Sequence, residues 1–111
     1  MKNLDNAKII FEKIHNSKQL SNAQIEETKI KLAQIYLAKN LFQKVIDTLQ
    51  FYSTDIDTEG LRKSIIGATY LQNKNFRTAK EFYSQPEVMQ SNLVDKSILE
   101  KANTIFEIMQ V

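Results

Sequence analysis

Two stretches of the sequence, LAQIYLAKNLF (residues 32–42) and IGATYLQNKNF (residues 66–76), align with each other without a gap. Three aligned pairs are identical: Tyr36 with Tyr70, Leu37 with Leu71, and Phe42 with Phe76. Four more pairs match in kind: Leu32 with Ile66, Ala33 with Gly67, Val45 with Ala79, and Leu49 with Tyr83. A helical hairpin cannot bury its apolar face alone, so hairpins repeated at a constant spacing stack on one another. The repeat therefore predicts stacked helical hairpins.

Apolar residues recur at i, i+3 and i+4 along most of the chain, which is the spacing of amphipathic helices. The low content of Gly (2) and Pro (1) also favours helices over a β fold. Ser21 and Gln24 form a capping-box pattern, so a helix should begin near Asn22. We expect six helices joined by short turns and no strand. They cover residues 4–14, 22–38, 42–52, 57–72, 76–83 and 92–110, with Asp57 as the N-cap of the fourth and Pro86 ending the fifth.

The periodicity also predicts which side chains each helix buries. The second helix should bury Ile25, either Ile30 or Leu32, Ala33, Tyr36 and Leu37, and the third carries Phe42, Val45, Ile46, Leu49 and Tyr52. The last helix presents Val94, Ile98, Ala102, Ile105, Phe106 and Met109 on one face. The dipeptide Phe-Tyr occurs at residues 51–52 and again at 82–83. Adjacent side chains point in different directions, so one member of each pair should be partly exposed.

Composition narrows the function classes. The 111 residues fit one domain, and a net charge of +2 gives no basis for nucleic-acid or anionic-membrane binding. The absence of cysteine excludes disulfides and thiolate metal sites. No apolar run approaches the roughly 20 residues that span a bilayer, and Asp5 interrupts the segment where a signal peptide would be apolar. We expect a cytoplasmic protein without membrane insertion, or a periplasmic domain if the chain is a fragment of an anchored protein.

No combination of residues suggests catalysis. His15 is the single histidine and has no cysteine or second histidine with which to bind zinc. Gly60 and Gly67 belong to no phosphate-binding motif, and the adjacent Glu26 and Glu27 diverge on a helix. The aromatic residues lie at core spacing without clustered Lys or Arg. The sequence predicts a protein that is not an enzyme and that binds no metal or cofactor.

The repeated positions resemble the tetratricopeptide repeat (TPR), whose length of about 34 residues equals the separation of each aligned pair. Leu32, Ala33, Tyr36, Val45 and Leu49 fill the TPR pattern once, and Ile66, Gly67, Tyr70, Ala79 and Tyr83 fill it again. Lys29 and Lys63 stand where the family has an early Trp, and the proline that closes a repeat is missing after Leu49. Leu4, Ala7, Phe11 and Ile14 match the spacing and apolar character of Phe42, Val45, Leu49 and Tyr52.

The resemblance implies one TPR-like domain over residues 1–111, folded as a short right-handed solenoid. Its parts are a half repeat or cap helix (1–18), two repeats (22–54 and 57–85) and a capping helix (91–110). The run from IKLAQIYLAKNLF to the last helix is also similar to the TPR-like domain of the YfgM-type ancillary subunit of the bacterial Sec translocon, which is periplasmic.

A TPR-like solenoid is a protein-interaction module, a scaffold or adaptor, whose concave face is lined by the first helix of each hairpin. Repeat matching places eight residues there: Ile30, Gln34, Leu37, Ala38, Ser64, Ala68, Leu71 and Gln72. This uncharged lining does not match the carboxylate clamp of chaperone-binding members, and fits an amphipathic helix or apolar peptide. The alternatives are a groove filled by the chain's own last helix, a homo-oligomerisation domain, and an RNA-binding helical repeat.

Overall fold

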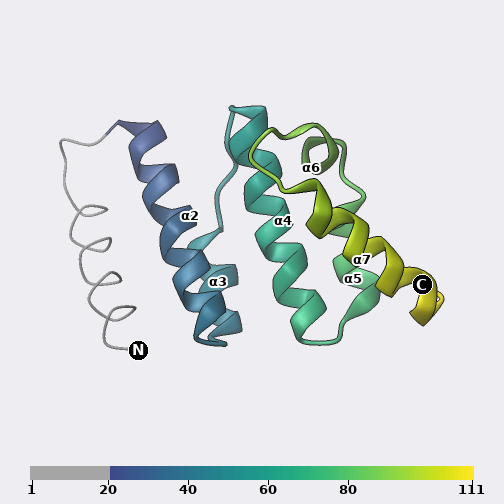
Figure 1. Ribbon diagram of the computed structural model, residues 1–111. Helices are drawn as coiled ribbons and strands as arrows, with labels where there is room; N and C mark the ends of the chain where they lie inside the picture. The colour runs from purple at the N-terminus through teal and green to yellow at the C-terminus, as the bar shows by residue number, and fades with distance from the viewer. Residues whose placement is uncertain (1–20) are drawn as a thin grey trace. The chain divides into compact units, whose positions relative to one another are not determined.

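The computed structural model describes residues 21–111, and the helix expected within residues 4–14 lies outside that range. The chain divides into two compact units, Met1–Phe51 and Tyr52–Val111. The described residues are all-α, with six helices and no strand (Figure 1). The helices of the first unit are α2 (Asn22–Ala38) and α3 (Phe42–Thr48). Those of the second are α4 (Ile56–Gln72), α5 (Phe76–Tyr83), α6 (Pro86–Gln90) and α7 (Lys96–Met109).

The first unit is a helical hairpin in which α3 folds back against α2. The predicted capping box is confirmed: the Gln24 backbone N–H donates to Ser21 Oγ at 3.2 Å, and the Ser21 N–H donates to Gln24 Oε1 at 3.0 Å. Ala33 and Val45 are fully buried. Ile30 and Leu32, which the sequence offered as alternatives, are both buried.

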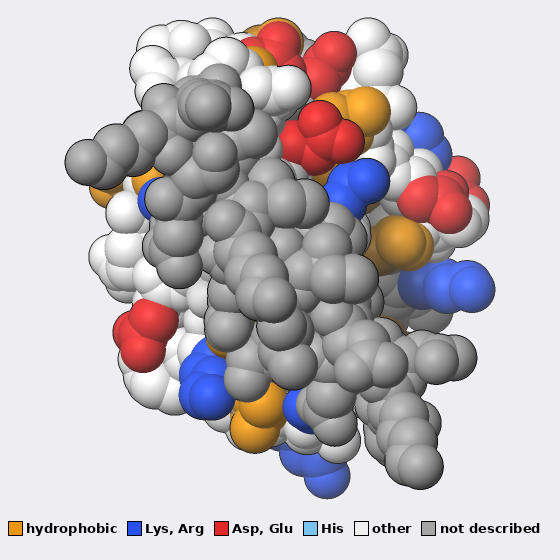
Figure 2. Space-filling model, turned by 90° about the vertical axis from the view of Figure 1, so that its left-hand side faces the viewer, with side chains coloured by type: hydrophobic (Ala, Val, Ile, Leu, Met, Phe, Trp, Pro, Cys, Tyr) orange, Lys and Arg blue, Asp and Glu red, His pale blue; other side chains and the backbone are white. Residues whose placement is uncertain are grey.

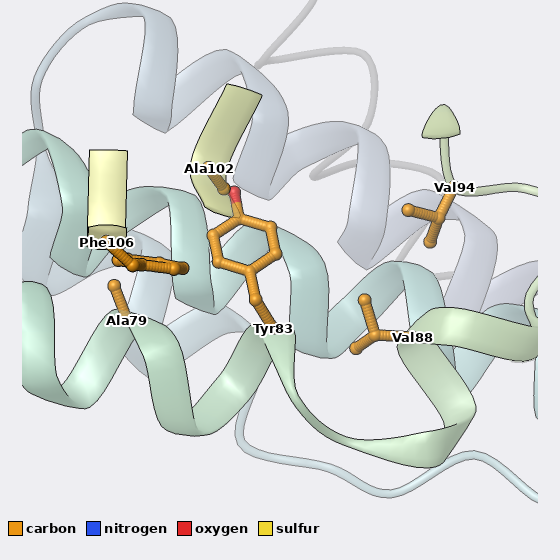
Figure 3. Packing of buried hydrophobic residues seen from close by; sticks show 6 residues of the cluster. All are labelled: Ala79, Tyr83, Val88, Val94, Ala102 and Phe106. Carbon is orange, nitrogen blue, oxygen red and sulfur yellow. The ribbon is translucent and has the colours of Figure 1, made fainter. Parts of the chain in front are cut away.

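The second unit is a hairpin with two further helices. In it α4 packs against both α5 and α6, and α7 packs against α5 (Figure 1). One buried hydrophobic cluster joins them: Ala79 and Tyr83 from α5, Val88 from α6, Val94 from the following segment, and Ala102 and Phe106 from α7. Figure 3 shows the Tyr83 ring reaching from α5 toward Ala102 on α7. Burial raises the pKa of the Tyr83 hydroxyl to about 12.

The two hairpins match each other at the spacing of the sequence repeat, and the match includes the backbone hydrogen bonds of their turns. Both first helices end in a Schellman motif, in which the residue after the helix cap is left-handed. Asn40 has φ 60° and Lys74 has φ 63°. The Leu41 N–H donates to the Tyr36 carbonyl at 2.9 Å, and the Asn75 N–H donates to the Tyr70 carbonyl at 2.9 Å. Each hairpin of the sequence repeat is therefore closed by the same turn.

The end of α3 and the start of α4 differ from the sequence prediction. Helix α3 ends at Thr48 with Leu49 as its C-cap, so Tyr52 lies outside the helix and is exposed. The N-cap of α4 is Asp55 and not Asp57, because Asp55 Oδ2 accepts from the Thr58 backbone N–H at 3.0 Å. The Asp57 carboxylate instead accepts the Asn92 N–H at 2.9 Å, a contact across the fold that local spacing does not reveal.

The C-terminal boundaries also need correction. Helix α7 begins at Lys96 and not near Asn92, because the Asp95 carboxylate caps it by accepting the Ser97 N–H at 2.9 Å. Pro86 follows the end of α5 as expected, but it also opens the short helix α6. Proline is favoured at the first position of a helix, where its missing N–H costs no hydrogen bond. Ile98 and Met109, expected on the apolar face of the last helix, are both about half exposed.

Candidate interaction surface

The eight residues assigned to a concave face differ in how much surface they offer. In α2, Gln34 and Ala38 are exposed, Leu37 is half-buried and Ile30 is buried. In α4, Gln72 is exposed. Ser64 is buried and donates its hydroxyl to the Leu61 carbonyl at 2.7 Å, while Ala68 and Leu71 are half-buried against the hydrophobic cluster. Of the eight, Gln34, Ala38 and Gln72 are therefore open to solvent, and Ile30 and Ser64 serve the packing.

The position of α7 bears on the alternative in which the last helix fills the groove. Within the second unit α7 packs against α5, the second helix of the hairpin. Ala102 and Phe106 make this contact, with the Phe106 ring centre 6.0 Å from that of Tyr83. α7 therefore extends the second unit beside α5 and does not lie along α4.

A buried ion pair lies at the start of α4. Arg62 Nε donates to Glu59 Oε1 at 2.8 Å and Arg62 Nη2 donates to Glu59 Oε2 at 2.7 Å, with both residues buried. The Ser53 backbone N–H donates to Glu59 Oε1 at 3.0 Å. Burial by itself raises the pKa of Glu59, but the hydrogen bonds from Arg62 and Ser53 and the charges of Arg62 and Lys63 outweigh it. The pKa is lowered as a result.

The ion pair continues toward α6. Lys63 Nζ lies 3.9 Å from Glu59 Oε2 and 3.2 Å from Glu87 Oε2. Gly60 on the same turn permits close packing, because a Cβ there would overlap the Glu87 carbonyl oxygen and lie 2.5 Å from Ser91 Cβ. The charged cluster and the glycine together fix α6 on the first turns of α4. Sequence reasoning missed this cluster, although the spacing of Glu59, Arg62 and Lys63 (i, i+3, i+4) was a usable signal.

The two Phe-Tyr pairs behave as predicted, with one member of each pair more exposed than the other. Tyr83 is buried while Phe82 is half-buried and stacks on Tyr70, with ring centres 5.9 Å apart. Tyr52 is 85% exposed, and its ring lies over the Arg62 guanidinium, whose Cζ is 5.0 Å from the ring centre. Arg62 therefore orients an exposed aromatic side chain while its own charge is held by Glu59.

Within residues 21–111, no group of three or more His, Cys, Asp or Glu side chains could hold a metal ion. His15 lies outside this range. An open pocket of about 410 Å³ is lined by Arg77, Lys80, Glu81, Ser84, Gln110 and Val111. Charges of both signs surround it, and no nucleophile–base pair is formed by its lining residues.

The surface in Figure 2 shows basic side chains standing among acidic and hydrophobic ones where described residues are visible. None of the described helices is both long enough and apolar enough to span a membrane.

No protein-family model matches this chain, and no curated protein or solved structure matches it either.

Proposed function

We propose that this protein is a non-enzymatic protein-interaction module of the TPR type, which binds a helix or peptide of a partner protein on a concave face. One observation carries the proposal. At the spacing of the sequence repeat, the two hairpins share the bounds of their first helices, the start of their second helices and their left-handed turn residues. Chains built from such repeats bury their shared core between hairpins and use the remaining faces for recognition.

The concave-face candidates that are exposed have uncharged side chains. Gln34 and Ala38 on α2 and Gln72 on α4 are exposed, and half-buried Leu37 and Leu71 stand next to them in sequence or one turn away. Amide groups with aliphatic neighbours suit a helix that presents an apolar face with polar edges.

Photo-crosslinking tests the proposal. A photoreactive amino acid replaces Gln34 or Gln72 in the full chain, which is then irradiated in extract from the source cells. A matched control carries the same amino acid at Gln43, an exposed glutamine on α3. Positions 34 and 72 should trap the same partner and position 43 should not. Equal products at all three positions, or none at 34 and 72, would contradict the proposal.

A second candidate function, homo-oligomerisation, draws support from α7. Ile98, Ile108 and Met109 are exposed on this helix, with Ile108 at 72%. Exposed apolar ends of helical repeats need a cover. Light scattering over a range of concentrations distinguishes the two functions, because an oligomer formed through α7 should dissociate when Ile108 is replaced by Glu. A monomer at every concentration removes this candidate.

The RNA-binding alternative has less support, because Lys63 and Lys96 in the second unit are bonded to protein groups. Absence of RNA binding at low salt would close it.

A further inference from the structure

A second surface of the molecule combines exposed apolar side chains with excess negative charge. It lies on the second unit where α4 begins, beside α6 and the segment that leads into α7 (Figure 1). Three large apolar side chains are exposed there: Met89 at 61%, Leu93 at 55% and Ile56 at 48%. We call these three residues the α4–α6 apolar patch.

Hydrogen bonds hold the backbone beneath the patch in one arrangement. The Ser91 hydroxyl donates to the Asp57 carbonyl at 2.7 Å, and the Asn92 N–H donates to Asp57 Oδ1 at 2.9 Å. Ile56 is adjacent in sequence to Asp57, and Leu93 is adjacent to Asn92, so these bonds also hold the backbone of both apolar residues. Lys96 Nζ donates to the Met89 carbonyl at 2.6 Å and to the Ser91 carbonyl at 3.3 Å. The patch is therefore preorganised, which lowers the entropy cost of binding.

The charged groups around the patch give it a net negative rim. Four carboxylates border it, from Asp55, Asp57, Glu87 and Asp95, against the ammonium groups of Lys63 and Lys96. Lys63 is paired with Glu87 at 3.2 Å, and Lys96 is turned onto backbone carbonyls. Glu59 and Arg62, also on α4, form a buried ion pair whose two charges cancel. The four carboxylates and two ammonium groups of the rim have a formal charge of −2, and Lys101, whose charge also acts on Asp95, brings the rim to −1.

The carboxylates of Asp55, Glu87 and Asp95 stay ionised at neutral pH, because hydrogen bonds lower the pKa of each. The side-chain and backbone hydrogen bonds from Thr58 lower the pKa of Asp55. The backbone and side-chain hydrogen bonds from Ser97 lower the pKa of Asp95. Asp55 and Asp95 cap the N-termini of α4 and α7, and their carboxylates remain exposed and negatively charged there.

We propose that the α4–α6 apolar patch is a docking site for a basic amphipathic helix of a partner protein. An apolar stripe covers Met89, Leu93 and Ile56, and Lys or Arg residues beside that stripe face the acidic rim. Charge complementarity of this kind selects the partner and speeds the encounter, while burial of the exposed apolar side chains supplies the affinity. The patch shares no residue with the eight concave-face candidates, so either proposal can fail without the other.

The probe is a synthetic amphipathic peptide of Leu and Lys, about 14 residues long so that a helix can form. Its control has Glu in place of Lys. Binding to the full chain is followed by calorimetry at low and at high salt. We expect the Leu/Lys peptide to bind, more weakly at high salt because exposed charges are screened, and the Leu/Glu peptide not to bind.

Three variants locate the site. Met89→Gln with Leu93→Gln should weaken binding roughly tenfold, because the apolar area is lost. Asp55→Asn with Asp95→Asn should weaken it roughly two- to fivefold per charge, while Asn keeps both helix caps. Ile108→Gln is the matched control: it removes an exposed apolar side chain from the other end of α7, about 18 Å from Lys96 along the helix axis, and should leave binding unchanged.

Several results would overturn the proposal. They are failure of the Leu/Lys peptide to bind, equal binding of the Leu/Glu peptide, unchanged binding to the Met89→Gln and Leu93→Gln variant, or an equal loss with Ile108→Gln. Self-association of the wild-type chain through the patch would show in light scattering and would also overturn it. Circular dichroism checks that each variant is folded.

Discussion

At the scale of single residues, the Glu59 carboxylate is buried and held by hydrogen bonds from both Arg62 and Ser53. It accepts two of these bonds from the Arg62 side chain and one from the Ser53 backbone. A buried carboxylate of this kind is costly to disturb, because Arg62 would then keep its charge without its main counter-ion. Ser53 belongs to the segment between α3 and α4, so this carboxylate also holds that segment against α4.

Replacing Glu59 by Gln should lower the free energy of unfolding at neutral pH by about 1–3 kcal/mol, since a charged hydrogen-bond acceptor is lost. The lowered pKa of Glu59 gives this loss a pH dependence. The stabilisation from the ionised carboxylate is present above the unfolded pKa, near 4.5, and is lost as the pH falls through the lower folded value. Urea unfolding of both proteins from neutral pH down to about pH 3 measures the difference.

The matched control is Glu27→Gln, which removes the exposed pair between Glu27 and Lys31 at 3.5 Å. Exposed pairs contribute little, so this change should stay within about 0.5 kcal/mol. If the Glu59→Gln difference were constant across the pH range, the carboxylate could not be ionised in the way described.

The two glycines of α4 should respond differently to a methyl group. At Gly60 it would overlap the Glu87 carbonyl oxygen, so Gly60→Ala should cost about 2 kcal/mol or more by forcing α6 away. At Gly67 it would lie 3.1 Å from Tyr83 Cε2 and 3.3 Å from Phe82 Cβ, so these neighbours need to shift by only a few tenths of an ångström. The gain in helix propensity, about 1 kcal/mol, then offsets that strain.

Thermal unfolding of Gly60→Ala and Gly67→Ala measures both effects. Equal destabilisation of the two variants would show that the close approach of α6 to Gly60 is not maintained in solution. Gly67 lies against the large Tyr83 ring, and the aligned positions of the first hairpin hold Ala33 and the smaller Leu49.

At the scale of the elements, the turns after α2 and α4 decide where each hairpin reverses. Both turns place a residue other than glycine at positive φ, Asn40 in one and Lys74 in the other. The left-handed conformation costs most residues about 1–2 kcal/mol, but Asn tolerates it because its short side chain bonds locally. The two turns share a geometry and differ in strain.

Lys74→Gly should therefore raise the free energy of unfolding by about 0.5–1 kcal/mol, because glycine adopts this conformation without strain. Asn40→Gly should change it by less. A higher urea midpoint at an unchanged slope would record the gain. Loss of stability in Lys74→Gly, like that of a glycine placed inside a helix, would contradict the left-handed assignment.

At the scale of the whole molecule, the second unit depends on one hydrophobic cluster that joins α5, α6 and α7. Phe106 is buried in it and lies on the helix that follows the repeated hairpins. The Phe106 carbonyl also accepts the Val111 N–H at 3.1 Å, which repeats the turn bond made by Tyr36 and Tyr70. In all three helices an aromatic residue thus supplies the carbonyl that closes the last turn.

Phe106→Ala should cost about 3–5 kcal/mol, because it leaves a cavity at the contact between α5 and α7. Domains of this size have a total stability of about 5–15 kcal/mol, so the variant should be partly unfolded near 37 °C. Ile108→Ala on the exposed side of the same helix should change stability by no more than about 0.5 kcal/mol. Comparable melting temperatures for the two variants would mean that α7 is not packed as described.

The sequence by itself determined the all-α class, the bounds of α2 and α5, the Ser21 capping box and the repeated positions of the two hairpins. These features depend on local propensity and on a helical period that adjacent residues reveal. The different directions of adjacent side chains also predicted that one aromatic residue of each Phe-Tyr pair would be partly exposed.

The tertiary structure decided what local patterns leave open. Asp55 caps α4 because Asp57 is bonded to Asn92, a residue distant in sequence. The Glu59–Arg62 pair is buried and bonded to the Ser53 backbone, and α6 lies close to α4 because Gly60 has no side chain. The apolar patch of Met89, Leu93 and Ile56 exists because α6 and the start of α4 meet. Each of these depends on contacts between residues far apart in the chain, which periodicity within a single helix does not encode.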